Sequence, residues 1–459
     1  MNFLEEAKRY EEQFKEDLKQ IVSIPSLRDD MTKEEHAPFG KACREALDKM
    51  MEIGQKAGFH VKDIDGYACV IEYGEQEESI GILAHLDIVP IGDGWTHDPL
   101  ACEEVNGFIF GRGVLDDKGP LIAALTAMRI LKEHNIQLSK KIQLICGCDE
   151  ESGMQCMDYY CKHEKLPLYS FTPDANFPAM YGEKGHMAIE VKKLLKGDLL
   201  SMTAGERMNV VIGKADAVVK NFKDEETFDF YLKSHGLKGS MIQKDDETSL
   251  HIEGVSAHAS LPWLGVNAGL HLLNFIGCVT GQDDLCKLSQ MFMDVRGYRA
   301  NIGFEGVYMG PLTLNCGIIR VENGILTMVL DIRYPNEVDS KTLVKGIQEA
   351  CQEANIEVDV NCLSDSEPLF LDPNSSFIQT LMSVYREYSG DDYTPALTMG
   401  GGTYARKLPN CVAFGPEFPQ PVKTDMVIGG PHQADEAIHL GEMMKSIAIY
   451  AKAMVELGK

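Results

Sequence analysis

The spacing of apolar residues changes its period several times along the chain. Apolar side chains recur every three or four positions over residues 4–21 and 39–57, which predicts two amphipathic helices. Gly58 stands just beyond the second helix, where glycine is a favoured residue. Short β-rich runs follow, with helices predicted over 120–133 and 153–163 between the later ones. The predicted strands are 61–64, 68–73, 80–84, 142–148 and 169–172.

This alternation is typical of an α/β domain with a mainly parallel sheet. From about residue 185 the order becomes strand, helix, two strands, helix, strand, which is the order of a ferredoxin-like α+β domain. Asn323-Gly324, between the two middle strands, is a strong hairpin signal. The segments that fill these six positions are 249–253, 266–281, 318–322, 325–333, 341–354 and 357–363.

The first pattern returns after residue 372. Helices are predicted over 377–388 and 440–457, with a short strand over 411–414. The second domain is therefore predicted to be inserted into the first. We place the discontinuous α/β domain at 1–184 and 373–459, and the inserted α+β domain at 185–372.

Composition and charge exclude several classes of protein. With 459 residues, two or three domains are expected. The net charge of -26, without a run of basic residues, argues against nucleic acid as a partner. No apolar run is long enough for a membrane span, and the first ten residues are too charged for a signal peptide. The 13 cysteines contain no Cys-x-x-Cys pair and favour reduced thiols in a cytoplasm.

Polar residues interrupt the apolar pattern where three predicted strands end. Because parallel strands bring their carboxyl ends to one crevice, these residues are expected to converge. Two imidazoles and several carboxylates are suitable ligands for two divalent ions, which need a shared carboxylate between them. The strand-end candidates are His85, Asp87, Glu150, Glu151 and Asp174, and Asp116 before a helix and His432 after a Gly-Gly-Pro turn complete the set.

Neighbouring candidates suggest a division of roles. Alternation along the strand places His85 and Asp87 on the same side, so Asp87 can accept a hydrogen bond from the imidazole nitrogen that does not face the metal. Of adjacent Glu150 and Glu151, one can hold metal while the other takes a proton from bound water. Each pair alone has a structural alternative, such as a helix cap or a solvated turn. Their joint occurrence at three strand ends favours the metal site.

Five ordered motifs resemble the aminoacylase and carnosinase metallopeptidase family, and most of all its bacterial dipeptidase V branch. They are GILAHLDIVP (81–90), GRGVLDDKGP (111–120), DEESG (149–153), TPD (172–174) and GGPH (429–432). The resemblance implies a zinc-peptidase-like catalytic domain of mixed, mainly parallel sheet, with an inserted lid domain. It also implies two divalent ions, zinc or manganese. His85 and Asp174 would bind one, Glu151 and His432 the other, and Asp116 would bridge them, with Glu150 as general base.

The inserted domain carries two further matching pieces, at 256–260 and 331–335. In the family, the histidine of the first stabilises the developing oxyanion and the arginine of the second receives a substrate carboxylate. These roles would fall to His258 and Arg333. His258 could instead pack or cap, and Arg333 could be a solvated edge charge. Asn209 and Gly401 are further candidates for substrate contact.

The predicted function is that of a cytoplasmic dipeptidase. Metal-bound hydroxide, formed with Glu150 as base, would attack the peptide bond of dipeptides that have a free carboxylate. The long insertion resembles the enlarged lid that replaces a partner subunit in dipeptidase V, so a monomer is expected. The nearest alternative is an N-acyl-amino-acid or N-succinyl-diamino-acid deacylase on the same scaffold. A non-catalytic metal or peptide binding protein is a third possibility.

Overall fold

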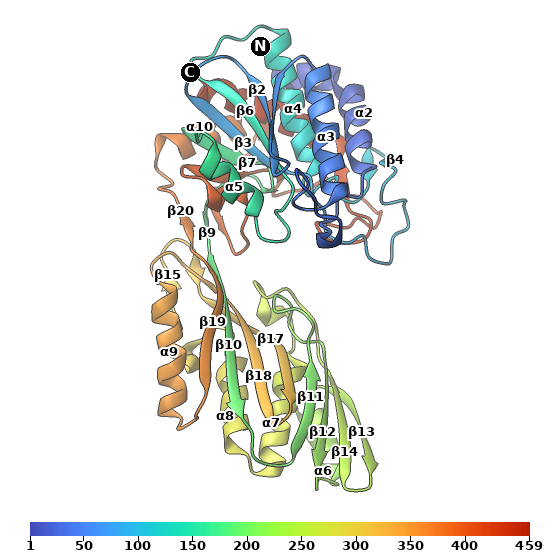
Figure 1. The fold of residues 1–459 in the computed structure, drawn as a ribbon, viewed down its shortest axis with the longest axis vertical. Helices are drawn as coiled ribbons and strands as arrows, with labels where there is room; N and C mark the ends of the chain where they lie inside the picture. The colour runs from blue at the N-terminus through green and yellow to red at the C-terminus, as the bar shows by residue number, and fades with distance from the viewer. The chain divides into compact units, whose positions relative to one another are not determined.

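The computed structural model describes residues 1–459, which form two compact units (Figure 1). Unit 1 consists of Met1–Gly182, Leu371–Leu397 and Gly402–Lys459, and unit 2 of Glu183–Phe370 with Thr398–Gly401. The chain thus leaves unit 1 after Gly182 to build most of unit 2 and returns to unit 1 at Leu371. The short segment Thr398–Gly401 groups with unit 2 although both its neighbours in sequence belong to unit 1.

Unit 1 is built on a mixed sheet with a parallel centre. Within this unit the strand order is β1-β2-β6-β3-β7-β22-β9. Strands β6, β3, β7 and β22 run parallel, and β1, β2 and β9 are antiparallel to their neighbours. These strands are β1 (His60–Ile64), β2 (Ala68–Tyr73), β3 (Ser79–His85), β6 (Lys141–Gly147), β7 (Tyr169–Thr172), β9 (Ala179–Glu183) and β22 (Cys411–Phe414). The short strands β20 (Leu369–Phe370) and β21 (Leu397–Met399) have residues in unit 2. All of β3 is buried, as its continuous apolar run requires.

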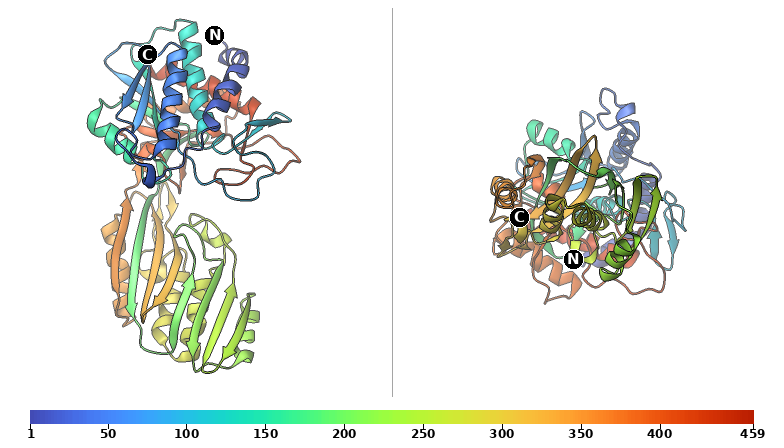
Figure 2. Two further views of the ribbon diagram at one scale, coloured as in Figure 1. Left: turned by 45° about the vertical axis from the view of Figure 1, so that its right-hand side comes forward. Right: turned by 90° about the horizontal axis from the view of Figure 1, so that it is seen from below.

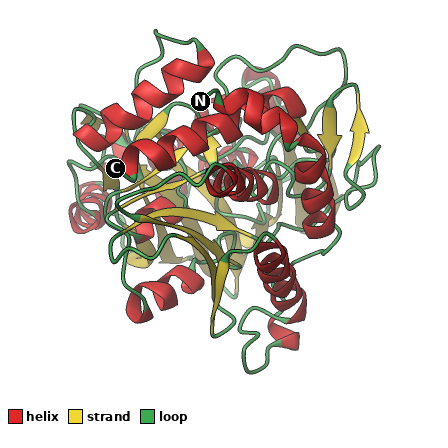
Figure 3. Cartoon of the chain, turned by 90° about the horizontal axis from the view of Figure 1, so that it is seen from above, coloured by secondary structure: helices red, strands yellow, loops and turns green.

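Helices lie alongside this sheet (Figure 3). They are α1 (Phe3–Arg9), α2 (Glu11–Val22), α3 (Lys41–Lys56), α4 (Lys118–Glu133), α5 (Gln155–His163), α10 (Ser376–Ser389) and α11 (Leu440–Leu457). Helix α4 contacts β3 and β6, and α11 packs on α4, α1 and α10. The single helix predicted over 4–21 is two helices. Tyr10 ends the first by donating its N–H to Ala7, and its hydroxyl donates to Glu133 of α4.

Smaller elements complete unit 1. A three-stranded sheet has the order β24-β5-β4, and β8 pairs in parallel with β23. Their bounds are β4 (Glu103–Val105), β5 (Phe108–Phe110), β8 (Ala175–Asn176), β23 (Pro416–Glu417) and β24 (Ala437–His439), with short 3-10 helices η1 (Asp30–Thr32) and η4 (Tyr404–Lys407).

Unit 2 contains an eight-stranded antiparallel sheet in the order β13-β14-β12-β11-β17-β18-β10-β19. Its strands are β10 (Gly185–Leu194), β11 (Leu199–Ala204), β12 (Lys214–Lys220), β13 (Lys238–Lys244), β14 (Glu247–Glu253), β17 (Thr313–Glu322), β18 (Ile325–Tyr334) and β19 (Asp359–Ser366). Its helices are α6 (Glu225–Ser234), α7 (Ala268–Thr280), α8 (Asp283–Met293) and α9 (Ser340–Glu353). The yellow and orange helices of this unit lie behind the strands in the left view of Figure 2. Short elements are η2 (Pro262–Leu264), η3 (Tyr298–Ala300), β15 (Glu305–Gly306) and β16 (Gly310–Pro311).

Half of this sheet has the predicted ferredoxin-like arrangement. Strands β10, β17, β18 and β19 form it, with helices before β17 and before β19. The predicted hairpin is confirmed, because Glu322 pairs with Ile325 and both Asn323 and Gly324 have positive φ. The predicted first strand, 249–253, is wrong. The first strand of the ferredoxin-like half is β10. The predicted segment lies in β14, which belongs to a four-stranded extension whose strand β11 pairs with β17.

Candidate metal centre and substrate contacts

The ends of three adjacent parallel strands bring the candidate ligands together in unit 1. Strand β3 lies between β6 and β7 and ends at His85. Glu150 and Glu151 follow β6, and Asp174 follows β7, at the same edge of the sheet. Ligand atoms of His85, Glu150 and Asp174 lie within 4.8 Å of one another. The parallel pairing of the three strands therefore brings residues that are far apart in sequence close together in space.

Asp116, just before α4, stands between the two imidazoles. Its Oδ1 is 2.9 Å from His85 Nε2, and its Oδ2 is 3.0 Å from His432 Nε2. His432 Nε2 is also 3.0 Å from Glu151 Oε1, and His85 Nε2 is 3.9 Å from Asp174 Oδ2. Each carboxylate oxygen of Asp116 therefore faces a different imidazole, and each imidazole has a further carboxylate beside it.

This donor set fits a pair of divalent cations. Four carboxylates share the cluster with two imidazoles, and Asp116, Glu151 and Asp174 have side chains no more than 15% exposed. Burying that much negative charge is costly unless cations compensate it. The four carboxylates are Asp116, Glu150, Glu151 and Asp174. A carboxylate shared between two imidazole-containing groups is also the arrangement that a two-metal site requires.

Asp87 contacts the site differently from the expectation. His85 Nδ1 lies 2.9 Å from the Asp87 backbone oxygen and 3.5 Å from its carboxylate. The carboxylate instead accepts the backbone N–H groups of Glu150 at 3.2 Å and Glu151 at 3.1 Å. Asp87 therefore orients His85 through its main chain and fixes the two glutamates through its side chain.

Glu436 and Arg112 are two buried residues that sequence reasoning missed. One carboxylate oxygen of Glu436 accepts the N–H groups of Gly113, Leu115 and Asp116 at 2.9–3.2 Å. Its other oxygen is 2.6 Å from Arg112 Nη1. The pair holds the loop that carries Asp116. In the sequence, Arg112 lies inside the GRGVLDDKGP motif and Glu436 lies four residues after His432, so both stand near candidate ligands. Neither position shows that the side chain points toward the loop of Asp116.

The protonation of His432 gives a testable consequence. Hydrogen bonds to Asp116 and Glu151 raise the pKa of His432 to about 10, so its imidazole is protonated at pH 7 in the metal-free protein. An imidazole must lose this proton before it binds a cation. We expect metal uptake at pH 7 to release at least one proton, and affinity to increase as pH rises toward 10. Titration calorimetry in two buffers of different ionisation enthalpy measures this release, and identical heats in both buffers would contradict it.

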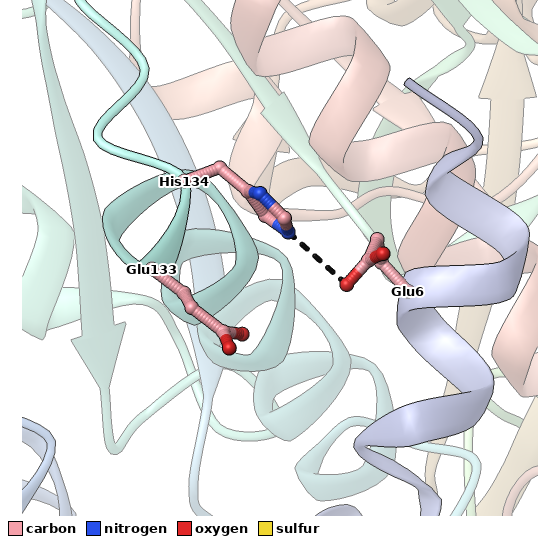
Figure 4. Close-up of side chains that lie close together, drawn as sticks. All are labelled: Glu6, Glu133 and His134. Atoms are coloured by element: carbon pink, nitrogen blue, oxygen red, sulfur yellow. Dashed lines mark ion pairs between the residues drawn. The ribbon is translucent and has the colours of Figure 1, made fainter.

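A second group of one imidazole and two carboxylates, Glu6, Glu133 and His134, also lies close together in unit 1. His134 points at Glu6, with 3.1 Å between Nε2 and Oε2, while Glu133 lies beside them (Figure 4). Arg9 already pairs with Glu6 at 2.6 Å, and the Tyr10 hydroxyl donates to Glu133 at 2.7 Å. Because Arg9 and Tyr10 already bind these carboxylates, we interpret the group as an ion-pair contact that joins α1 to the end of α4, and not as a metal site.

Arg333 lies near the end of β18 in unit 2. Its side chain is 7% exposed, its Nε donates to Asp331 at 3.2 Å, and its Nη1 donates to the Gly400 carbonyl at 2.5 Å. Asp331 also contacts His186 at 2.9 Å. These bonds hold one side of the guanidinium, and Nη2 makes no hydrogen bond within the protein. Arg333 is therefore a fixed side chain rather than a solvated edge charge.

The other unit 2 candidates lie on connected segments. His258 Nδ1 is 2.7 Å from the Ser260 hydroxyl, and the Ala259 N–H donates to the Asn209 carbonyl. A Cβ placed on Gly400 would lie 3.4 Å from Ser260, so the loop of Gly400 and Gly401 lies beside the segment of His258. His258 is exposed, whereas Asn209 and Gly401 are half-buried.

Comparison with known proteins identifies the family. Residues 81–456 match "Peptidase family M20/M25/M40". The chain belongs to this peptidase family. It is 37% identical to "Putative dipeptidase YtjP" of Bacillus subtilis (strain 168) over 100% of both chains. Its fold is similar to that of human carnosine dipeptidase 1, with a TM-score of 0.58, 15% identity and coverage of 100% of this chain and 99% of that one. It is also similar to the di-peptidase Dug1p of Saccharomyces cerevisiae, with a TM-score of 0.60, 13% identity and coverage of 99% and 98%.

Membership of the M20 family fixes the general chemistry. The M20 chain is a hydrolase that acts on peptide bonds, and its family implies divalent metal ions. The predicted family and the fold class of mixed sheets with helices are confirmed. No helix is both long and apolar enough to cross a bilayer.

Proposed function

We propose that this M20 peptidase is a dipeptidase that holds two divalent cations, zinc or manganese. The observation that supports this most is Asp116, whose two carboxylate oxygens face the imidazoles of His85 and His432. His85 and Asp174 would hold one cation, Glu151 and His432 the other, with Asp116 shared. When bound, the cations would supply an activated water and polarise the substrate carbonyl.

Glu150 is proposed as the general base. Burial raises the pKa of its carboxyl well above the ordinary value, and the Asp174 carboxylate adds to this. A raised pKa suits a carboxylate that must take a proton from the attacking water and return it to the leaving amine. The N–H of Glu150 is bound by Asp87, which keeps its position fixed. Asp87 therefore acts as a positioning residue for both the base and its neighbouring ligand.

Unit 2 is proposed to supply the contacts that recognise a dipeptide. His258 would donate a hydrogen bond to the oxygen on which negative charge develops. Arg333 would bind the free carboxylate of the substrate through Nη2, because Asp331 and Gly400 already hold the rest of its guanidinium. Asn209 and Gly401 are proposed as further substrate contacts.

Replacing Arg333 with Ala is expected to lower kcat/KM for dipeptides by about 10- to 100-fold, the effect of losing a charged hydrogen bond. Arg333→Lys should recover only part of this, because one ammonium group cannot bond Asp331 and the Gly400 carbonyl and also reach the substrate carboxylate. Steady-state kinetics on a dipeptide and on its C-terminal amide measure the effect. The loss should disappear with the amide, which has no carboxylate, and metal content should be unchanged. An equal loss on both substrates would reject the carboxylate contact.

A substrate panel separates the dipeptidase from the alternatives. Free dipeptides, N-acyl-amino acids and N-succinyl-diamino acids would be assayed with added metal and with chelator. A dipeptidase hydrolyses the free dipeptides and loses this activity with chelator. Preference for the acylated substrates would indicate a deacylase, and no hydrolysis at all would indicate a binding protein. Full-length similarity to proteins named "Putative dipeptidase" supports the first outcome.

Three finer features complete the proposal. We place the protein in the dipeptidase V branch, because unit 2 carries the additional strands β11–β14 beyond its ferredoxin-like half. The same extension supports a monomer. All 13 cysteines are free, which supports a cytoplasmic location.

A further inference from the structure

Unit 1 has a large cavity beside the proposed metal ligands. Its volume is about 940 Å³, within the range of small-molecule sites. Leu115, Asn176 and Gly430 line it, and each stands one or two positions from Asp116, Asp174 or His432. The cavity therefore adjoins the place where the peptide bond is proposed to be cut, although it contains none of the metal ligands.

Glu417 is the unusual residue of this cavity. Its backbone is fixed, because β23 pairs with β8 at Glu417 and Asn176, and the Phe177 N–H donates to the Glu417 carbonyl at 2.6 Å. Its half-buried carboxylate lines the cavity and makes no hydrogen bond or ion pair within the protein. Burial raises the pKa of this carboxyl, with a smaller contribution from Asp116. A desolvated carboxylate without a partner is costly unless a cation binds it.

The remaining lining suits a long side chain with a charged end. Apolar walls come from Phe108, Phe418, Val422, Ile428 and Met443. The other charged groups are Asp425, Glu442 and the exposed Lys423, so carboxylates outnumber ammonium groups three to one when Glu417 is counted. Lysine and arginine bury their aliphatic stems against apolar surface while their charged tips find a polar partner. The volume also far exceeds what an α-ammonium group alone would need.

We propose that this cavity receives the side chain of the N-terminal residue of the substrate, and that Glu417 binds its cationic tip. The enzyme then prefers dipeptides that begin with lysine or arginine. This inference rests on the proposed dipeptidase function. The cavity is assigned to the N-terminal residue because the carboxylate of the C-terminal residue is assigned to Arg333, which does not line the cavity.

The test compares lysine with its uncharged analogue norleucine. Values of kcat/KM are measured for Lys-Ala and Nle-Ala, and for Ala-Lys and Ala-Nle, with the metal-loaded wild type, Glu417→Gln and Glu417→Lys. Wild type should favour Lys-Ala over Nle-Ala by about 10- to 100-fold, as one charged hydrogen bond provides. The ratio should approach one in Glu417→Gln and fall below one in Glu417→Lys. Glu367→Gln, at an exposed position of unit 2, should keep the wild-type ratio.

Three results would overturn the inference. They are a wild-type ratio near one, an unchanged ratio in Glu417→Gln, and a lysine preference confined to Ala-Lys. Failure of the proposed function looks different, because wild type would then hydrolyse neither Lys-Ala nor Nle-Ala. In that case calorimetric binding of the same two dipeptides decides the inference, and equal affinities would reject it.

Discussion

Glu150→Gln is expected to lower kcat for dipeptides by about 100- to 10,000-fold, the contribution of a well-placed general base. Glutamine has nearly the same size and shape, but it cannot accept the proton of the attacking water. The backbone of residue 150 remains bound to Asp87, since its N–H is unaffected by the change. The loss should therefore lie in kcat, with KM little changed. Stopped or continuous hydrolysis assays on metal-loaded protein measure it.

The neighbouring residue provides a matched control. Glu151→Gln makes the same chemical change one position along, but Glu151 contacts His432 and is proposed as a metal ligand. That variant should lose bound metal, whereas Glu150→Gln should keep it. Elemental analysis of both purified proteins distinguishes the two roles. Full metal content together with wild-type kcat in Glu150→Gln would remove Glu150 from the role of base.

Asp116→Asn is expected to have the other large effect. The change removes the negative charge shared by His85 and His432 and leaves an amide nitrogen facing one of them. Partners that only support metal ligands contribute about 10- to 100-fold to affinity, so loss of a bridging ligand should exceed that. We expect less than one tightly bound ion per chain and activity too low to measure at ordinary metal concentrations.

A binding isotherm checks this expectation. Zinc is titrated into metal-free wild type and Asp116→Asn, and a thermal unfolding curve of each apoprotein shows whether the fold is retained. Asp116→Glu serves as the comparison, because it keeps the charge while displacing the carboxylate. If Asp116→Asn bound two ions with wild-type affinity, Asp116 would not be the shared ligand.

Much of the fold could be predicted from local patterns. Strands β2, β7 and β22 and helix α11 have the predicted bounds, because their apolar periods are strong and their ends carry turn or cap residues. The order of strands in unit 2 could not be predicted in the same way. Both β10 and β14 alternate apolar and polar residues, and only tertiary pairing decides which one lies beside β18.

In the candidate site, too, some residues could be predicted from local sequence and others depend on tertiary contacts. His85, Glu151 and Asp174 could be found because polar residues at the ends of buried strands are exceptional. The inward direction of Glu436 and the partnerless carboxylate of Glu417 could not be found, since isolated glutamates are ordinary in sequence and their burial depends on distant segments. The contact of His85 with the Asp87 carbonyl was likewise hidden, because alternation along a strand gives the side of a residue and not the bonding atom.

The central claim is that Asp116 lies between two divalent cations. Anomalous diffraction from crystals grown with zinc, recorded above and below the zinc absorption edge, locates such ions directly. We predict two peaks about 3.5 to 4 Å apart, one beside His85 and Asp174 and the other beside His432 and Glu151, with Asp116 bound to both. A single peak, or two peaks that do not share Asp116, would contradict this account.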